Sequence, residues 1–201
     1  IFEACHSKEF CAPNGGSISV ALSSTHTHEV IMNIKDTQFI NVQANGGGGA
    51  IRFDDDRSSV TIASELHIEG STFDGCSAKY GGAMYVTKYN DETTALLLTM
   101  KTTTFRNNKA TSAGGALYLY GKVKATLVGE TNIFEGNTVS GLSDSNNMVI
   151  ATDAQLIQDQ CHPLKSDDVS YTTVPSEITD DFVGCPFYTC NNGAVKYPGK
   201  A

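Results

Sequence analysis

Three consecutive carboxylates followed by an arginine, Asp54-Asp55-Asp56-Arg57, are the residues of this chain best suited to chemistry. Enzymes that cleave polysaccharides use clustered carboxylates with Lys or Arg, and three acids also supply the oxygen ligands that Ca²⁺ takes in proteins. Neighbouring residues in a strand or turn point apart, however, so these three do not converge by themselves. We therefore interpret Asp54, Asp55 and Asp56 as a solvated turn and keep Ca²⁺, with Asp91-Glu92 about one repeat further on, as the alternative. No other cofactor is expected.

A second group of candidate ligands is His26-Thr27-His28, which places two imidazoles on one side of an extended segment. A metal site needs three or four ligands in a defined geometry, and only two are visible here. This segment is also interpreted as a solvated turn.

Six cysteines, an even number, favour an oxidising compartment and structural disulfides. We predict local bridges Cys5–Cys11 and Cys185–Cys190, while Cys76 and Cys161 have no assigned partner. His6 and His162 each adjoin a cysteine, but a catalytic pair depends on spatial neighbours that spacing does not give.

The elements that would position these residues recur along the chain. Glycine pairs stand 33 residues apart, at Gly15-Gly16, Gly48-Gly49, Gly81-Gly82 and Gly114-Gly115. A second series is formed by Phe39, Phe73, Phe105 and Phe134, at spacings of 34, 32 and 29 residues. A fixed period of this length indicates a repeat architecture.

Between these markers, apolar residues alternate with polar ones, as at Ile18, Val20 and Leu22, and again at Val30, Met32 and Ile34. This alternation predicts about three short strands per repeat, and such units bury their apolar faces only by stacking. We predict an all-β, single-stranded parallel β-helix with about 33 residues per coil and four to six coils. The phenylalanines would form an internal ladder, and the glycine pairs from Gly48 onward would form the corners.

Within this scheme, residues 1–150 are predicted to form the coils, with Phe2 opening the first and Met148–Ile150 supplying a strand of the fifth. Residues 151–181 are predicted to be an irregular excursion, and residues 182–201 a further coil, a cap or the start of a next module. Aligned on the phenylalanines, the fourth repeat slips by one residue, with Val128 in the second apolar position, which predicts a bulge or tight turn.

Composition limits the class of function. The formal net charge of −8 and the lack of any basic run exclude an electrostatic nucleic-acid binder. No apolar run, Ala95–Leu98 included, approaches the length of a membrane span. Because the chain starts at Ile1 with neither a Met nor a leader, we expect a processed piece of a longer, secreted precursor.

Two motifs carry a family resemblance. They are Phe-x-x-Asn, at Phe105–Asn108 and Phe134–Asn137, and Gly-Gly-Ala followed by an apolar residue, at 48–51, 81–84 and 114–117. Together they resemble the chlamydial-type polymorphic outer membrane protein repeat over about residues 2–140. The resemblance implies a right-handed parallel β-helix and a surface-exposed module used for adhesion. Cys76 departs from the motif by replacing its asparagine.

Asn108 and Asn137 suit a left-handed turn position with side-chain bonds to a neighbouring coil. Serine and threonine residues also precede the phenylalanines, namely Thr37, Ser71, Thr103, Thr72 and Thr104. Columns of threonine could order water and bind ice, but Gln38, Asn132 and Ile133 interrupt them, so ordinary strand positions are the simpler interpretation.

The expected function is a non-enzymatic extracellular module for adhesion or for building a cell-surface structure. Expected partners are other protein modules, copies of the chain joined end to end, and surface glycans. Two alternatives stay open: a carbohydrate-active β-helix enzyme that uses Asp54–Asp56 and Arg57, and a glycan- or ice-binding protein.

Overall fold

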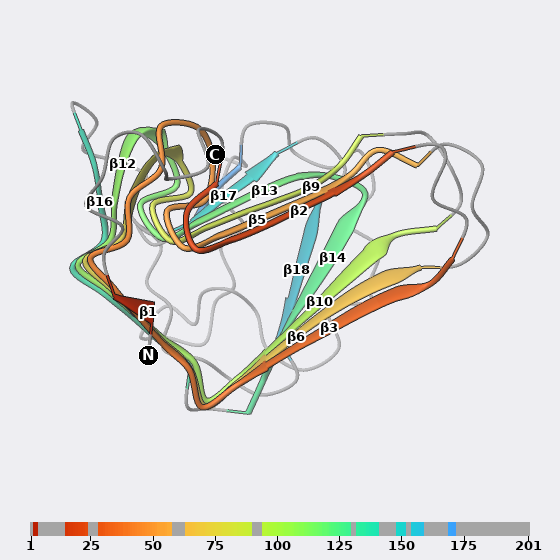
Figure 1. The fold of residues 1–201 in the computed structure, drawn as a ribbon, viewed down its shortest axis with the longest axis horizontal. Coiled ribbons are helices and arrows are strands. Elements are labelled where there is room, and N and C mark those ends of the chain that lie inside the picture. Colours follow the sequence, from red (N-terminus) through yellow and green to blue (C-terminus); the bar gives the residue numbers. More distant parts are fainter. Residues whose placement is uncertain are drawn as a thin grey trace, which may run out of the picture.

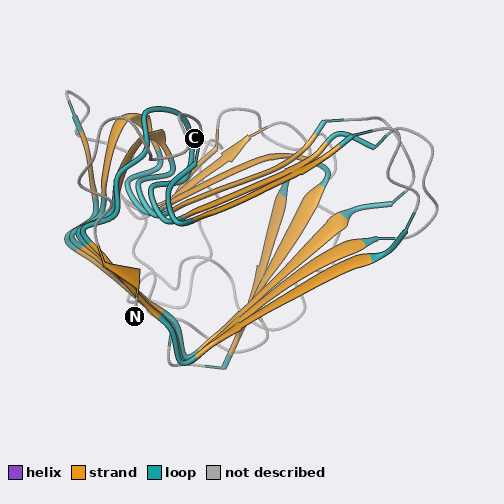
Figure 2. Cartoon of the chain, in the orientation of Figure 1, coloured by secondary structure: helices purple, strands orange, loops and turns teal. Residues whose placement is uncertain are grey.

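A computed structural model describes residues 2–3, 15–23, 28–57, 63–89, 94–129, 132–140, 148–151, 154–158 and 169–171. For residues 2–3, 157–158 and 169–171 the structure describes the backbone alone. The described residues form strands and connecting loops, with no helix among them (Figures 1 and 2).

The strands form four parallel sheets. Sheet A contains β1 (Phe2–Glu3), β4 (Gln38–Ile40), β7 (Thr72–Asp74), β11 (Thr104–Arg106) and β15 (Ile133–Glu135). Sheet B contains β2 (Ile18–Leu22), β5 (Ile51–Asp55), β9 (Met84–Lys88), β13 (Leu117–Gly121), β17 (Met148–Ala151) and β19 (Val169–Tyr171). Sheet C contains β3 (Val30–Lys35), β6 (Ser64–Glu69), β10 (Leu96–Lys101), β14 (Val123–Val128) and β18 (Gln155–Gln158). Sheet D contains β8 (Ser77–Tyr80), β12 (Lys109–Ala113) and β16 (Thr138–Val139).

Each coil runs through sheets B, C, A and D before it returns to sheet B one layer further on. In Figure 1 the chain turns clockwise as it recedes from the viewer, so the coil is right-handed. Ile18, Ile51, Met84 and Leu117 occupy one register position in sheet B and are spaced 33 residues apart. The solenoid has about four turns of roughly 32 residues. The prediction of a parallel β-helix is therefore confirmed.

The phenylalanine ladder is also confirmed. Phe39, Phe73, Phe105 and Phe134 lie in register in sheet A, with neighbouring ring centroids 4.7–4.9 Å apart and ring planes within 7° of parallel. The first three are completely buried, and Phe134 is partly buried. The ring spacing follows from the strand spacing of a parallel sheet, since identical residues in register must stack.

The two glycines of each pair have different roles. The first, at Gly48, Gly81 and Gly114, has a positive φ of 56–68°, which residues with a Cβ rarely adopt. The second lies against the same corner of the next coil, so that a Cβ on Gly82 would stand 2.1 Å from the carbonyl oxygen of Gly115. The corners are therefore glycine-rich because stacked backbones leave no room for a side chain.

Asn108 and Asn137 hold the coils together at the corner after sheet A. The Asn108 amide donates to the Phe73 carbonyl, and its oxygen accepts the Cys76 N–H. The prediction that these side chains bond to a neighbouring coil is correct. The left-handed conformation, however, belongs to the preceding residue, Asn107 or Gly136, and not to the buried asparagines themselves.

Two further features differ from the sequence predictions. Sheet D adds a fourth strand to a coil. The hydrophobic pattern does not predict this strand, because its short segments alternate only weakly between apolar and polar residues. The fourth repeat does not slip, since Leu127 pairs with Met100 and Ala125 with Leu98. The corner between β14 and β15 is longer than the corresponding corner of the preceding coil. An alignment on Phe134 misplaces the strand before it, because such an alignment takes the corner length as constant.

The fifth coil forms without a glycine pair, as expected, because Met148 pairs with Leu117. Within residues 151–181, β18 and β19 extend sheets C and B, where the sequence had suggested an irregular segment. Residues 182–201 lie outside the described part of the chain.

Candidate functional site

Asp55 and Arg57 form an ion pair inside the solenoid, and each side chain is only 1% exposed. The Arg57 Nε donates to Asp55 Oδ1 and the Nη2 to Oδ2, both at 2.9 Å. Asp55 ends strand β5 with its side chain inward, at the register position that Leu22 fills in the preceding coil. The interpretation of this segment as a solvated turn is thus wrong for Asp55 and Arg57, because β5 alternates through Asp55 and turns its carboxylate into the core.

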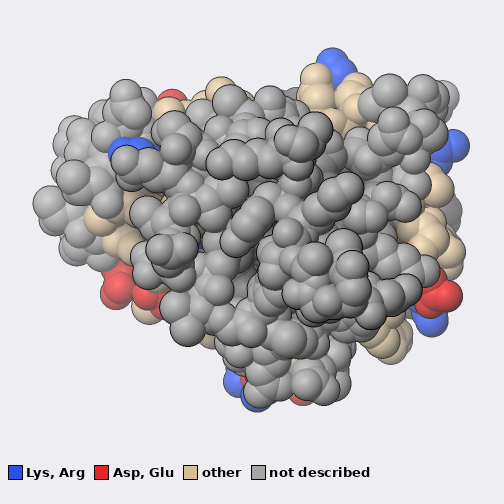
Figure 3. All heavy atoms as spheres, turned by 180° about the vertical axis from the view of Figure 1, so that it is seen from behind, with Lys and Arg blue, Asp and Glu red and all other residues tan. Residues whose placement is uncertain are grey.

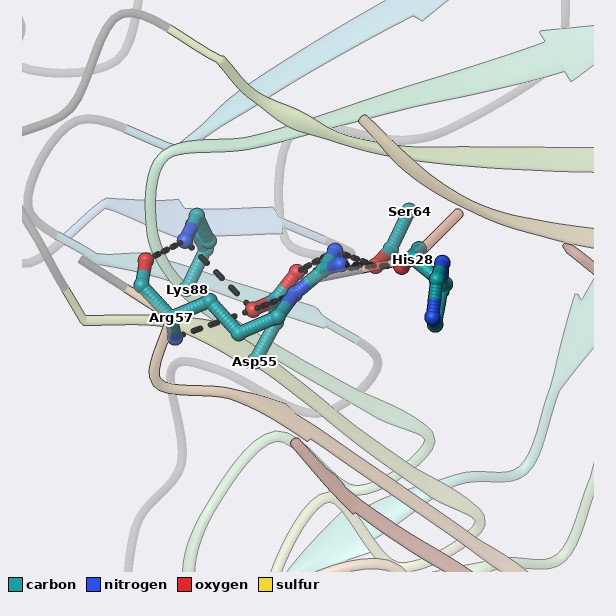
Figure 4. Close-up of polar contacts among 5 residues, drawn as sticks. All are labelled: His28, Asp55, Arg57, Ser64 and Lys88. Atoms are coloured by element: carbon teal, nitrogen blue, oxygen red, sulfur yellow. Dashed lines mark hydrogen bonds and ion pairs between the residues drawn. The ribbon is translucent and has the colours of Figure 1, made fainter. Parts of the chain in front are cut away.

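Two more side chains complete this buried ionic cluster, shown in Figure 4. Lys88 lies one coil further on in register with Asp55, with its Nζ 3.4 Å from Asp55 Oδ1, and it also donates to the Arg57 carbonyl. Ser64 faces the pair from sheet C and donates to Asp55 Oδ2 at 2.8 Å. The Arg57 Nη1 donates to the backbone carbonyl of His28, so the histidine contributes its backbone to the cluster.

These contacts determine the protonation of Asp55. Burial raises the pKa of its carboxyl group, but hydrogen bonds from Arg57 and Ser64, together with the charge of Lys88, outweigh it, so the pKa lies below its usual value. An ionised, buried carboxylate that accepts from five donors cannot serve a substrate in solvent. The cluster therefore ties β5, β6 and β9 together and does not form a reaction centre.

The two neighbouring aspartates do not join this cluster. The Asp54 side chain points to the outer face of sheet B, where it accepts from Arg52 at 2.5 Å and from the Thr87 hydroxyl at 2.8 Å. Among the described residues, no three His, Cys, Asp or Glu side chains lie close enough together to hold a metal ion. Asp91, Glu92 and His26 lie outside these residues, so a Ca²⁺ site remains a prediction without support from the geometry.

Cys76 is the one cysteine whose surroundings are described; it is buried, with a free thiol in the asparagine column. Its Sγ lies 3.6 Å from the Phe39 carbonyl oxygen, where the asparagines of later coils place an amide. Burial raises the pKa of this thiol to about 12. The predicted bridges Cys5–Cys11 and Cys185–Cys190, and Cys161, lie outside the described residues.

The hydroxyls that suggested an ice-binding face separate into two groups. Ser71 and Thr103 are buried at the corner before sheet A, where their hydroxyls donate to the carbonyls of Glu69 and Lys101. Thr72 and Thr104 pair on the outer face of sheet A, between Gln38 and Ile133. Of these hydroxyl residues, Thr72 and Thr104 therefore share an outer column of two threonines, and nothing in its geometry favours ice binding.

A surface feature that the sequence reasoning missed is a cluster of five tyrosines over the outer side of sheet B. We call it the tyrosine face, and it consists of Tyr80, Tyr85, Tyr89, Tyr118 and Tyr120. The rings of Tyr85 and Tyr118 stack with centroids 5.4 Å apart and planes 8° apart. The 33-residue spacing of these two was the signal that could have revealed it, since that period places them in register.

The other rings stand at an angle to this stack. Tyr80 is tilted by 46° to Tyr85 and by 54° to Tyr118, and Tyr89 is tilted by 43° to Tyr120. Tyr89 is 49% exposed, the other four are partly buried, and the hydroxyls of Tyr85 and Tyr89 lie 2.8 Å apart at the surface. The tyrosine face thus combines apolar ring surface with hydroxyl donors and acceptors.

Two cations flank the tyrosine face. The Arg52 guanidinium lies 5.4 Å from the centre of the Tyr85 ring, and the Lys79 ammonium 5.2 Å from that of Tyr80. Arg52 also forms an ion pair with Asp54, so its charge is balanced within the same surface. Burial, and next the hydrogen bond with Tyr89, raise the pKa of Tyr85, which keeps its hydroxyl protonated.

Elsewhere on the surface, several of the described charges form mixed pairs. Glu69 on sheet C bridges Lys35 and Lys101, one coil away on either side. Seen from behind, the described acidic and basic residues lie scattered around the rim of the molecule (Figure 3). No single-sign patch is formed by the charges visible there.

One segment of this solenoid is similar to a known repeat family. Residues 102–120 match the model of the Chlamydia polymorphic membrane protein (Chlamydia_PMP) repeat. The chain carries a Pmp-type repeat. The matched segment contains Phe105 of the ladder, Asn108 of the corner column, and the glycine pair Gly114-Gly115.

The Pmp-type repeat therefore contains three structural positions of a coil: the stacked phenylalanine ring, the asparagine whose amide bonds to the neighbouring coil, and the glycine corner. Neither the curated proteins nor the solved structures gave a match to this chain. In the part of the chain that the structure describes, no helix has the length and apolar character needed to cross a membrane.

Proposed function

We propose that this protein is a non-enzymatic, surface-associated β-helix module that works by adhesion, with the tyrosine face as its contact surface. The observation that carries the proposal is the packing of Tyr80 and Tyr89 against Tyr85, Tyr118, Tyr120 and Arg52 on the outer face of sheet B. Tyrosine and arginine are the residue types in which binding energy at interfaces concentrates. The Pmp-type repeat supports the surface association.

The arrangement of charge supports a binding role over catalysis. The acid and base candidates of the sequence, Asp55 and Arg57, are enclosed and satisfied by one another, so a polysaccharide chain has no access to them. A glycoside hydrolase typically needs an accessible carboxylate pair that flanks the scissile bond. Turnover of polyuronic substrates by the purified chain, with or without Ca²⁺, would contradict our proposal.

The test is an adhesion assay on the intact chain. Fluorescent beads coated with the protein are offered to a panel of animal, plant and microbial cells, and retained beads are counted. We expect retention on at least one cell type, and a loss of ten-fold or more for Tyr89→Ala combined with Tyr120→Ala. These outer side chains do not contribute to the phenylalanine core, so the variant should keep the circular dichroism of the wild type.

A matched control is Ile31→Ala, which removes a similar apolar side chain that is 50% exposed on the outer face of sheet C. Its beads should be retained like those of the wild type. If no cell type retains wild-type beads, or if the tyrosine and isoleucine variants behave alike, adhesion through the tyrosine face is wrong.

A further inference from the structure

We infer that the ligand of the tyrosine face is a neutral carbohydrate, bound through the pyranose ring and its hydroxyls. This inference rests on the proposed adhesive function and specifies its ligand. Pyranose rings have apolar C–H faces and polar edges. A site for them needs an aromatic ring face beside groups that both donate and accept hydrogen bonds.

Tyr89 supplies the ring face. Tyr85 is covered on both sides, by Tyr118 at 5.4 Å and by Arg52 at 5.4 Å, so its ring plane is not open to a ligand. Tyr89 is instead 49% exposed and is tilted by 43° against Tyr120, which leaves part of its ring turned toward solvent. The stacked rings of Tyr85 and Tyr118 form a rigid surface beside the Tyr89 ring.

The paired hydroxyls supply the polar contacts. Tyr85 and Tyr89 share one hydrogen bond of 2.8 Å at the surface, so each oxygen keeps further capacity for a partner. A sugar hydroxyl can donate to one oxygen and accept from the other. This reciprocity distinguishes a hydroxyl-rich ligand from an apolar one, which would leave the pair unsatisfied.

The charges favour neutral over acidic sugars. Arg52 is held by Asp54 at 2.5 Å and by the Tyr85 ring, so it is not free to pair with a carboxylate or sulfate of the ligand. Arg52 and Asp54 balance each other, and the whole chain carries a net charge of −8. This net negative charge repels an anionic glycan, and Lys79 lies beside Tyr80 at the other end of the tyrosine face.

The experiment is a glycan array that contains neutral, sialylated and sulfated oligosaccharides, probed with the full chain and its variants. We expect binding to neutral glycans and a reduction of at least ten-fold for Tyr89→Ala. Tyr89→Phe, which keeps the ring and removes the hydroxyl, should bind with an intermediate loss. Ile31→Ala should bind like the wild type.

The outcomes separate this inference from the proposed function. Cell adhesion that depends on Tyr89 and Tyr120 but survives periodate oxidation of the cell-surface sugars, with no array binding, overturns the carbohydrate ligand and leaves adhesion to a protein partner. Binding to acidic glycans alone, or array binding that Tyr89→Ala does not change, also overturns it. Adhesion that periodate abolishes, with neutral glycans bound, supports it.

Discussion

The Arg57 guanidinium donates to both carboxylate oxygens of Asp55, and both side chains are buried in the core of the solenoid. Asp55 and Lys88 occupy this register position in consecutive coils, and the coils on either side of them hold Leu22 and Gly121, so the stack itself does not require a charge there. The pair instead fixes the connection after β5 to the backbone at His28 and to Lys88. A buried charge network of this kind is costly to break because its partners are left unpaired.

Replacing Asp55 by alanine should therefore lower the free energy of unfolding by about 3–5 kcal/mol, since Arg57 and Lys88 would remain buried without their carboxylate. Urea unfolding followed by circular dichroism measures this loss. The matched control is Asp74→Ala, which removes the partly exposed partner of the exposed Arg106 and should cost about 0–1 kcal/mol. Equal losses in the two variants would show that the buried network is not important for stability.

Acid should weaken the same network. The pKa of Asp55 is lower in the folded than in the unfolded chain, where a value of about 3.9 applies, so its contribution is complete above that pH and is lost as the pH falls through the folded pKa. We expect the stability difference between wild type and Asp55→Asn to shrink below about pH 4. Urea unfolding from pH 7 to pH 2 measures it, and a difference that stays constant over that range would contradict the assignment.

The phenylalanine ladder should dominate the stability of sheet A. Phe73→Ala removes a completely buried ring between two stacked neighbours and should cost about 3–5 kcal/mol. Phe73→Leu keeps most of the volume and should cost clearly less, which keeps the test informative if the alanine variant does not fold. Ile133→Ala, 49% exposed in the same sheet, should change stability by no more than about 0.5 kcal/mol in urea unfolding.

Cys76 should be inert in the folded protein. Burial raises the pKa of its thiol to about 12, so almost no thiolate is present at pH 8, and the side chain is closed to reagents. We expect iodoacetamide to leave Cys76 unmodified in the native protein and to alkylate it in 8 M urea, as measured by mass spectrometry of its peptide. Rapid alkylation under native conditions would mean that this corner opens readily.

The sequence determined the backbone plan of this protein. The 33-residue glycine spacing and the recurring phenylalanines predicted the solenoid, its ladder and its corners, because stacked coils place identical residues in identical surroundings. Met148 was assigned to a fifth coil for the same reason. Such features depend on the local residue pattern and on its repetition, and both can be read from the sequence alone.

Only the tertiary structure decided the surroundings of individual polar residues. Asp54 and Asp55 are adjacent in the chain, yet one lies on the outer face with Arg52 and the other lies in the core with Arg57 and Lys88. Likewise, Tyr89 and Tyr120 meet only because consecutive coils stack. Burial and proximity arise from the packing of distant segments, and for that reason the composition of a short acidic stretch could not reveal whether it was solvated or enclosed.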